Sequence, residues 1–393
     1  MRDEDLTRLL TVAAEDVRPS HSAAAGWERA RRVRHARRVA GATATAVVLL
    51  TGGVVLALRP ADLPAPTTAA TVTATPVPNA PVQRPPQQLT YPASPLNRLG
   101  DPVTASLSSR PVRQALALYQ PVDAETGTEG RIRVLGDDGL VRELDVVTPA
   151  RTRDASGNEA FALKSGSLSA DGRLAAFAQT GEVIVVDLTT AQVRRYPLNG
   201  YLEHVLWAGD RLFVGDNDTT YELDRRTGVS RTMPLSPWEM VVPDQDDRTD
   251  TLLTLGDLRD GLTLSRWTQS ADRTDRGDRP VDFRALPAGN RVNEFYGRAW
   301  QRGDEVARAG WISTGGMDGL EGVAVLDATT GVVTRLLDLG RDRWKGCCQV
   351  LGWDGDAVLL RNDPDGLLRW EPATGEVTGV ARNLKGEISL AAG

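Results

Sequence analysis

Histidine and cysteine, which often carry acid–base, nucleophilic or metal chemistry, are scarce in this chain of 393 residues. The histidines are His21, His35 and His204, and the two cysteines, Cys347 and Cys348, are adjacent. A zinc site made of these residue types needs about three or four ligands. No Gly-x-Ser-x-Gly motif supplies a nucleophilic serine for a catalytic triad with histidine. The sequence therefore predicts no catalytic residue, no metal site and no cofactor site.

The adjacent cysteines are the most unusual chemical feature. Outside the cytoplasm thiols tend to oxidise, and Cys347 and Cys348 could then close a strained vicinal disulfide whose Cα separation falls below the common range. The alternative is two thiols on opposite faces at the start of a strand, with one of them buried. Quinoprotein dehydrogenases use such a ring against their cofactor, but this sequence lacks the tryptophan-docking repeats and the matching metal ligands of that class.

Acidic residues gather in three loops, at 216–218, 244–250 and 362–366. Calcium prefers oxygen-rich loops of this kind, but none of the three has the complete twelve-residue loop with its closing glutamate. Asp, Asn and Gly also favour turns for backbone reasons alone. We interpret the three clusters as turns.

The elements that hold these residues form a repeat. Four segments share an apolar strand end, an acidic residue, a turn ending in Thr-Gly or a variant of it, and a new strand. The acidic positions are Asp187, Asp224, Asp327 and Glu371. The first two are 37 positions apart and the last two 44, which is the length of one four-stranded propeller blade. Upstream of three of these positions, a second turn such as Asp171-Gly172 joins two further strands.

The unit from Ser167 to Thr190, with its Ser-Leu-Ser-Ala-Asp-Gly-Arg-Leu-Ala and Val-Val-Asp-Leu-Thr-Thr stretches, resembles a blade of the WD-repeat and TolB-like propeller superfamily. The whole chain resembles the membrane-anchored WD-repeat-like proteins of actinobacteria, most of which have no assigned function. The Gly-His and Trp-Asp pairs of true WD repeats are missing. The resemblance implies an all-β fold, a β-propeller of four-stranded blades over residues 99–393, but no particular partner.

Six blades can be counted, and the fourth, about 237–285, is degenerate. The C-terminal segment 387–393 either completes the first blade or belongs to a seventh. Two β-sandwiches are the alternative architecture. In a propeller, His204 falls on an early strand that commonly lines the central channel, and we interpret it as structural or channel-lining.

The N-terminal part predicts a membrane anchor. Residues 39–58 carry no charge and are long enough to span a bilayer. Six arginines precede them and should remain cytoplasmic by the positive-inside rule: Arg29, Arg31, Arg32, Arg34, Arg37 and Arg38. We expect residues 1–38 to be cytoplasmic with a short amphipathic helix, 39–58 to be a single transmembrane signal anchor, and 59–98 to be a Pro/Thr-rich disordered linker.

Charge and aromatic residues bear on the partner. The net charge is −6, and residues 1–38 carry nine arginines against six acids, so the remainder is clearly acidic. An acidic outer part disfavours nucleic acid and anionic lipid as its partners. Four tryptophans outside the repeated strand positions are candidate rim anchors for a protein or glycan of the cell envelope: Trp238, Trp300, Trp311 and Trp344.

The leading hypothesis is a non-enzymatic binding or scaffold module, displayed outside the cytoplasm on a membrane anchor. The alternatives are an extracytoplasmic propeller enzyme, either hydrolase or quinoprotein-like, and a sensor that signals through the N-terminal helix. An enzyme should gather His204 or several acids with perturbed pKa values in the channel. A binding module should present an exposed aromatic or apolar patch on one rim.

Overall fold

The computed structural model describes residues 79–391, apart from 124, 155–156, 217–218, 245–250, 259–260, 270–273, 341–346 and 363–365. The chain divides into two units, Met1–Ala74 and Thr75–Gly393. The predicted cytoplasmic segment 1–38, the predicted span 39–58 and the linker as far as 78 all lie outside the described residues. Within the part that is described, no helix is both long and apolar enough to cross a bilayer.

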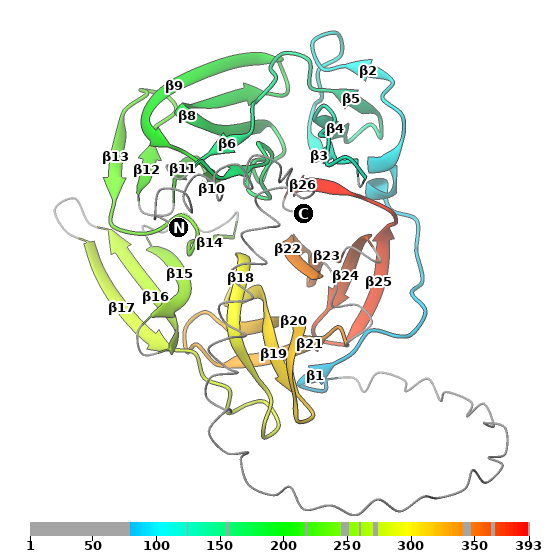
Figure 1. Cartoon of the computed structure of the whole chain (residues 1–393), viewed down its shortest axis with the longest axis vertical. Helices are drawn as coiled ribbons and strands as arrows, with labels where there is room; N and C mark the ends of the chain where they lie inside the picture. Colours follow the sequence, from blue (N-terminus) through cyan, green and yellow to red (C-terminus); the bar gives the residue numbers. More distant parts are fainter. Residues whose placement is uncertain are drawn as a thin grey trace, which may run out of the picture. The chain divides into compact units, whose positions relative to one another are not determined.

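The second unit is an all-β propeller, in which small, mostly antiparallel sheets stand side by side around a common centre (Figure 1). The first sheet joins the two ends of this unit. From the centre outward its strands are β26 (Gly386–Leu390), β3 (Ala115–Pro121), β4 (Arg133–Gly136), β5 (Val141–Glu143) and β2 (Ala105–Ser106). Ile388 of β26 is paired antiparallel with Tyr119 of β3. The C-terminal segment therefore completes the first sheet, which is one of the two outcomes that the sequence left open.

The remaining sheets follow one another along the chain. The second group comprises β6 (Thr152–Arg153), β7 (Glu159–Ala160), the long β8 (Leu174–Asp187) and β9 (Gln192–Tyr201), and the third sheet comprises β10 (His204–Ala208), β11 (Arg211–Gly215), β12 (Thr220–Leu223) and β13 (Ser230–Met233). The next two contain β15 (Thr251–Leu258), β16 (Gly261–Gln269) and β17 (Thr274–Pro280), then β18 (Arg291–Arg302), β19 (Glu305–Thr314), β20 (Met317–Asp327) and β21 (Val333–Asp338). The last comprises β22 (Cys347–Asp354), β23 (Ala357–Asn362), β24 (Gly366–Glu371) and β25 (Glu376–Ala381).

The sheet that follows β13 departs from the four-stranded pattern, as the weak repeat between 237 and 285 predicts. Its described strands are β15, β16 and β17, and the segment on their inner side contributes a single bridge, Met240 to Thr254. The short β14 (Val241–Val242) pairs parallel with β18 of the next sheet instead. The inner segment of this blade is therefore shared between two sheets.

The predicted acidic turns are present. One carboxylate oxygen of Asp327 accepts hydrogen bonds from the backbone N–H groups of Thr329 (3.0 Å) and Thr330 (2.6 Å). Asp187 does the same for Thr189 at 2.9 Å. Burial alone would raise the pKa of Asp327, but the hydrogen bonds from Thr330 outweigh it and hold the pKa below its usual value. These hairpins are thus fixed by a local carboxylate, as the repeat predicts.

The Asp-Gly turn of the second blade also locks two sheets together. Gly172 has φ +67°, a conformation that side chains disfavour, and a Cβ added to it would lie 2.1 Å from the Ala115 carbonyl oxygen. The backbone N–H of Ala115 in turn donates to the Gly172 carbonyl oxygen at 2.8 Å. Glycine is required here both for the turn and for the close approach of β3.

The folded unit begins earlier than the sequence predicts. Residues 79–98 were expected to belong to the disordered linker, but β1 (Val82–Gln83) pairs parallel with β21, and a 3₁₀ helix, η1 (Pro95–Gly100), buries Leu99. Gln83 is 3% exposed and its side chain bonds the Trp370 indole N–H (2.7 Å) and the Pro372 carbonyl (2.8 Å). The physical reason is that buried polar side chains such as Gln83 fix the segment on the sheets through specific hydrogen bonds, so the segment needs few apolar residues to be ordered. We call residues 79–100 the N-terminal strap.

Candidate axial binding site

The innermost strands of the propeller begin with polar and charged residues that lie close together. Figure 1 shows β10, β14, β18, β22 and β26 nearest the centre of the sheets. Six residues in or just before the inner parts of the sheets, joined by the contacts given below, are called the axial cluster: Lys164, Glu203, His204, Trp238, Arg298 and Glu387. They come from five different sheets or inter-sheet segments, so only the closed propeller assembles them.

Lys164 is the centre of an ion-pair network. Its Nζ lies 3.3 Å from Glu203 Oε1, and the two side chains are 15% and 25% exposed. Burial lowers the pKa of the Lys164 ammonium, while the carboxylates of Glu203 and Glu387 act in the opposite direction. Glu387 is itself paired with Arg361 at 3.5 Å. The carboxylates of this network are therefore held by cations.

A further ion pair, between Glu129 and Arg151, extends the network on the side of the first sheet. Glu129 Oε1 lies 2.7 Å from Arg151 Nε, and Gln120 Nε2 donates to Glu129 Oε2 at 2.9 Å. Burial raises the pKa of Glu129 despite the nearby Arg151, and the negative charge of Glu387 adds to the increase. Glu387 of the first sheet therefore interacts electrostatically with both Glu129 and Lys164.

Arg298 is the least satisfied charge of the cluster. Its side chain is 7% exposed. Among the described residues its only hydrogen-bond partner is the Pro237 carbonyl oxygen, 3.3 Å from Nη1, and no carboxylate lies within ion-pair distance. Burial lowers the pKa of the guanidinium to about 10. A buried cation without a counter-charge is costly for folding, so its retention calls for an explanation.

A β-bulge places Arg298 in this position. The pairing of β18 with β19 is interrupted between Tyr296 and Trp300, and Gly297 within the interruption has φ +63°. A bulge re-aims the side chains that follow it. Arg308 of β19 fills the gap by donating from Nε to the Gly297 carbonyl oxygen at 3.1 Å. The buried side chain of Arg308 therefore stabilises the bulge that orients Arg298.

His204 begins β10, the inner strand of its sheet, as predicted, but it does not stand open at the axis. It is 4% exposed and its ring lies against the ring of Trp238, with centroids 5.4 Å apart. Trp238 is half-buried and precedes β14. In the chain, the two rings directly follow Glu203, which pairs with Lys164, and Pro237, whose carbonyl oxygen binds Arg298.

The other predicted rim tryptophans separate into different environments. Trp300 is 6% exposed, belongs to a core between sheets and donates its indole N–H to the Val350 carbonyl at 2.9 Å, which corrects its predicted rim position. Trp311 is half-buried, with its ring centroid 5.9 Å from that of Tyr296. Trp344 lies outside the described residues. Trp238 is the rim candidate that joins the axial cluster.

The cysteine pair lies at the start of β22, close to the bulge of β18. Cys348 carries no free thiol and its Sγ lies 3.7 Å from Tyr296 Oη. The backbone N–H of Cys348 also donates to this oxygen at 3.3 Å. The side chain of Cys347 lies outside what the structure describes, so the vicinal pairing stays a prediction.

Two of the predicted acidic loops bind backbone N–H groups, Asp216 within its own turn and Asp244 on a residue 59 positions away. Asp216 accepts a hydrogen bond from the Thr219 N–H at 2.7 Å, and Asp244 accepts one from the Gly303 N–H at 2.7 Å. In the described ranges, no three His, Cys, Asp or Glu side chains are grouped as metal ligands.

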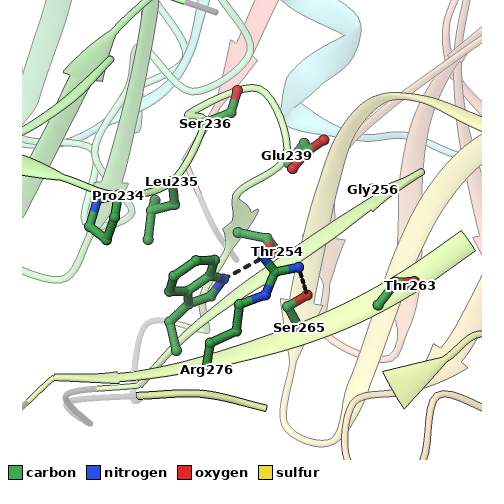
Figure 2. A pocket seen from close by; sticks show the side chains of 10 residues that line it. Pro234, Leu235, Ser236, Glu239, Thr254, Gly256, Thr263, Ser265 and Arg276 are labelled. Carbon is green, nitrogen blue, oxygen red and sulfur yellow. Dashed lines mark hydrogen bonds between the residues drawn. The ribbon is translucent and has the colours of Figure 1, made fainter. Parts of the chain in front are cut away.

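A small polar pocket of about 110 Å³ lies farther out, between the loop after β13 and the strands β15 to β17 (Figure 2). Within it the Trp267 indole N–H donates to Thr254 Oγ1 at 3.0 Å, and Arg276 donates to Ser265 Oγ at 3.3 Å. The Arg276 guanidinium also covers the Trp267 ring, 4.9 Å from its centroid. The aromatic face is therefore already occupied by a side chain of the protein.

The sequence did not reveal Lys164, Glu203, Arg298 or Glu387 as site residues. Each is a single charged residue without a motif, and they lie in different repeats. The signal that could have found Glu203 and Glu387 is their common place at the start of an inner strand. Arg298 could not be found in this way, because the bulge that orients it has no sequence repeat.

No protein-family model and no curated protein matches the sequence. Among solved structures, BamB from Moraxella catarrhalis is 16% identical over 68% of this chain and 77% of that chain, with a TM-score of 0.34. TolB from Acinetobacter baumannii is 14% identical over 70% of this chain and 65% of that chain, with a TM-score of 0.41. A chain of the nidogen/laminin complex is 10% identical over 70% of this chain and 99% of that chain, with a TM-score of 0.42. Likenesses this distant carry no argument about function, and the propeller arrangement rests on the strand pairings themselves.

Proposed function

We propose that this protein is a non-enzymatic binding module, displayed outside the cytoplasm on the predicted single-pass anchor at 39–58, and that the axial cluster is the face it presents to an envelope partner. In this proposal the propeller has six blades closed by β26, and the chain is one of the membrane-anchored WD-repeat-like proteins that its sequence resembles. The partner is a protein or a glycan, in keeping with the acidic outer part.

One observation carries the proposal: charged and aromatic side chains from several sheets come together in the axial cluster, and their carboxylates are held in ion pairs. Glu203 is paired with Lys164 and Glu387 with Arg361. A carboxylate that is fixed by a cation is suited to recognition and to orientation of neighbours, whereas a general base must be free to accept a proton. The half-buried Trp238 adds a rigid surface of the kind that anchors interfaces.

A propeller enzyme is the second candidate, and one observation favours it. Burial lowers the pKa of Lys164 and raises that of Glu129, and the charge of Lys164 partly opposes the rise in the pKa of Glu129. Opposite shifts in neighbouring groups are typical of active sites. They also arise in structural ion-pair networks, and the ion pairs of both groups favour that interpretation here.

The test is site-specific crosslinking in the native envelope, with the full chain carrying a photo-crosslinking amino acid at position 238. The matched control carries it at position 229, because Val229 is 67% exposed on an outer hairpin. We expect a discrete adduct with an envelope component from position 238 and none from position 229. No adduct from position 238, together with turnover of ester or quinone substrates by the purified full chain, would overturn the proposal in favour of an enzyme.

A further inference from the structure

The bulge of β18 creates a feature that the fold itself does not require. Arg298 is more than nine-tenths buried, is bound by a single carbonyl oxygen among the described residues and faces no carboxylate partner. The two other buried arginines among the described residues have more partners, and Arg308 donates to the Gly297 and Leu255 carbonyl oxygens. Arg142, which is 1% exposed, donates to both oxygens of Asp138 and to the Arg110 carbonyl. The difference sets Arg298 apart from the structural arginines.

The surroundings of Arg298 add to this excess of positive charge. Arg298 acts on Lys164 as a second cation. The carboxylates of this network already have cation partners: Glu203 pairs with Lys164, Glu387 with Arg361, and Glu129 with Arg151. Arg298, in contrast, has no ion pair with any described carboxylate.

We propose that Arg298, with Lys164 beside it and the Trp238–His204 ring pair as a wall, binds a single carboxylate carried by the ligand. This inference rests on the proposed function and names the chemistry of the ligand. A planar guanidinium matches a carboxylate with two parallel hydrogen bonds, and such charge-assisted bonds are strong when water is excluded. The Pro237 carbonyl occupies one N–H of Arg298 and leaves the others for the ligand.

The charge of the whole molecule limits the size of the anion. The outer part of the chain is acidic, so it repels polyanions such as nucleic acid at long range. A ligand with one carboxylate is repelled much less, and its carboxylate can still pair with Arg298. The carboxyl terminus of a peptide and a sugar acid both supply this group, and the test distinguishes these two sources.

The experiment is isothermal titration of the full chain in detergent with N-acetyl-alanine, as a peptide terminus, and with glucuronate, as a sugar acid. N-acetyl-alanine amide and glucose are the uncharged controls. We expect one acid to bind saturably and its neutral counterpart not to bind. Arg298→Gln should weaken binding by about tenfold or more, because a charged hydrogen-bond pair is lost. The matched variant Arg302→Gln changes an arginine of the same strand that pairs with Glu305, and it should bind as the parent does.

Two outcomes would overturn the inference: neither acid binds, or the bound acid is held equally by Arg298→Gln. Folding of the variant is checked by its thermal unfolding, and Arg298→Met serves as a second variant if Arg298→Gln does not fold. A crosslinked partner from position 238 without any binding of the acids would contradict this inference alone and leave the proposed function standing.

Discussion

Asp138 and Arg142 show what a structural charge pair looks like in this protein. Hydrogen bonds from the buried guanidinium of Arg142 lower the pKa of Asp138 to about 2, against a usual value of 3.8. The folded-state pKa lies below the unfolded one, so the ionised pair stabilises the fold above pH 3.8, and this contribution is lost as the pH falls from 3.8 towards 2.

Asp138→Asn should therefore lower the free energy of unfolding at pH 7 by about 1–2 kcal/mol, because a buried guanidinium loses its counter-charge while the aspartate is partly exposed. The difference from the parent should shrink below pH 3.8. Urea unfolding of the full chain, followed by tryptophan fluorescence at pH 7 and at low pH, measures both effects. Asp137→Asn is the control, because its partner Arg113 is an exposed side chain. Equal losses for the two variants would contradict the assignment.

The same scale explains what the sequence could predict. Asp187 and Asp327 act on backbone groups two and three positions away, so a local motif is enough to identify them. Lys164 and Glu203, in contrast, are 39 positions apart, and Arg298 depends on a bulge that its sequence does not announce. Local turns were therefore predictable, and the axial cluster, which forms only when sheets meet, was not.

At the scale of elements, turns and straps connect one sheet with the next. Gly172→Ala should destabilise the protein by about 2–4 kcal/mol, since the new Cβ both strains the turn and collides with the Ala115 carbonyl oxygen. Gly181→Ala is the matched control, because Gly181 also has a positive φ, +80°, but nothing within 4 Å of the added Cβ. Thermal unfolding should show the larger loss for Gly172→Ala. A similar loss for both would mean that backbone strain alone matters.

The N-terminal strap is the element that the sequence missed, because its proline content predicts an extended linker. Gln83→Leu should lower the free energy of unfolding by about 1–3 kcal/mol, since the buried Trp370 indole N–H and Pro372 carbonyl lose their partner. Gln88→Leu, at an exposed position of the same strap, should have little effect. Urea unfolding of the two variants decides whether the strap is a structural part of the propeller. No loss for Gln83→Leu would show that the strap is dispensable.

At the scale of the whole molecule, the propeller brings distant residues to one axis. Ser389 of the last strand accepts a hydrogen bond from the Leu168 N–H (2.9 Å) and donates one to the Ser165 carbonyl (2.7 Å). The C-terminal strand thus holds the segment that carries Lys164. Closure of the first sheet and assembly of the axial cluster are therefore one event, and the binding face depends on the fold being complete.

Hydrogen exchange of the full chain, with and without the partner recovered by crosslinking, tests the central claim most directly. If the axial cluster is the binding face, the partner should slow exchange in the segments that carry it, 164–169, 203–206 and 296–300. Exchange at the outer hairpin turns, 187–192 and 224–230, should stay unchanged. Slower exchange confined to the outer hairpins, with the segments that carry the axial cluster unaffected, would contradict the account.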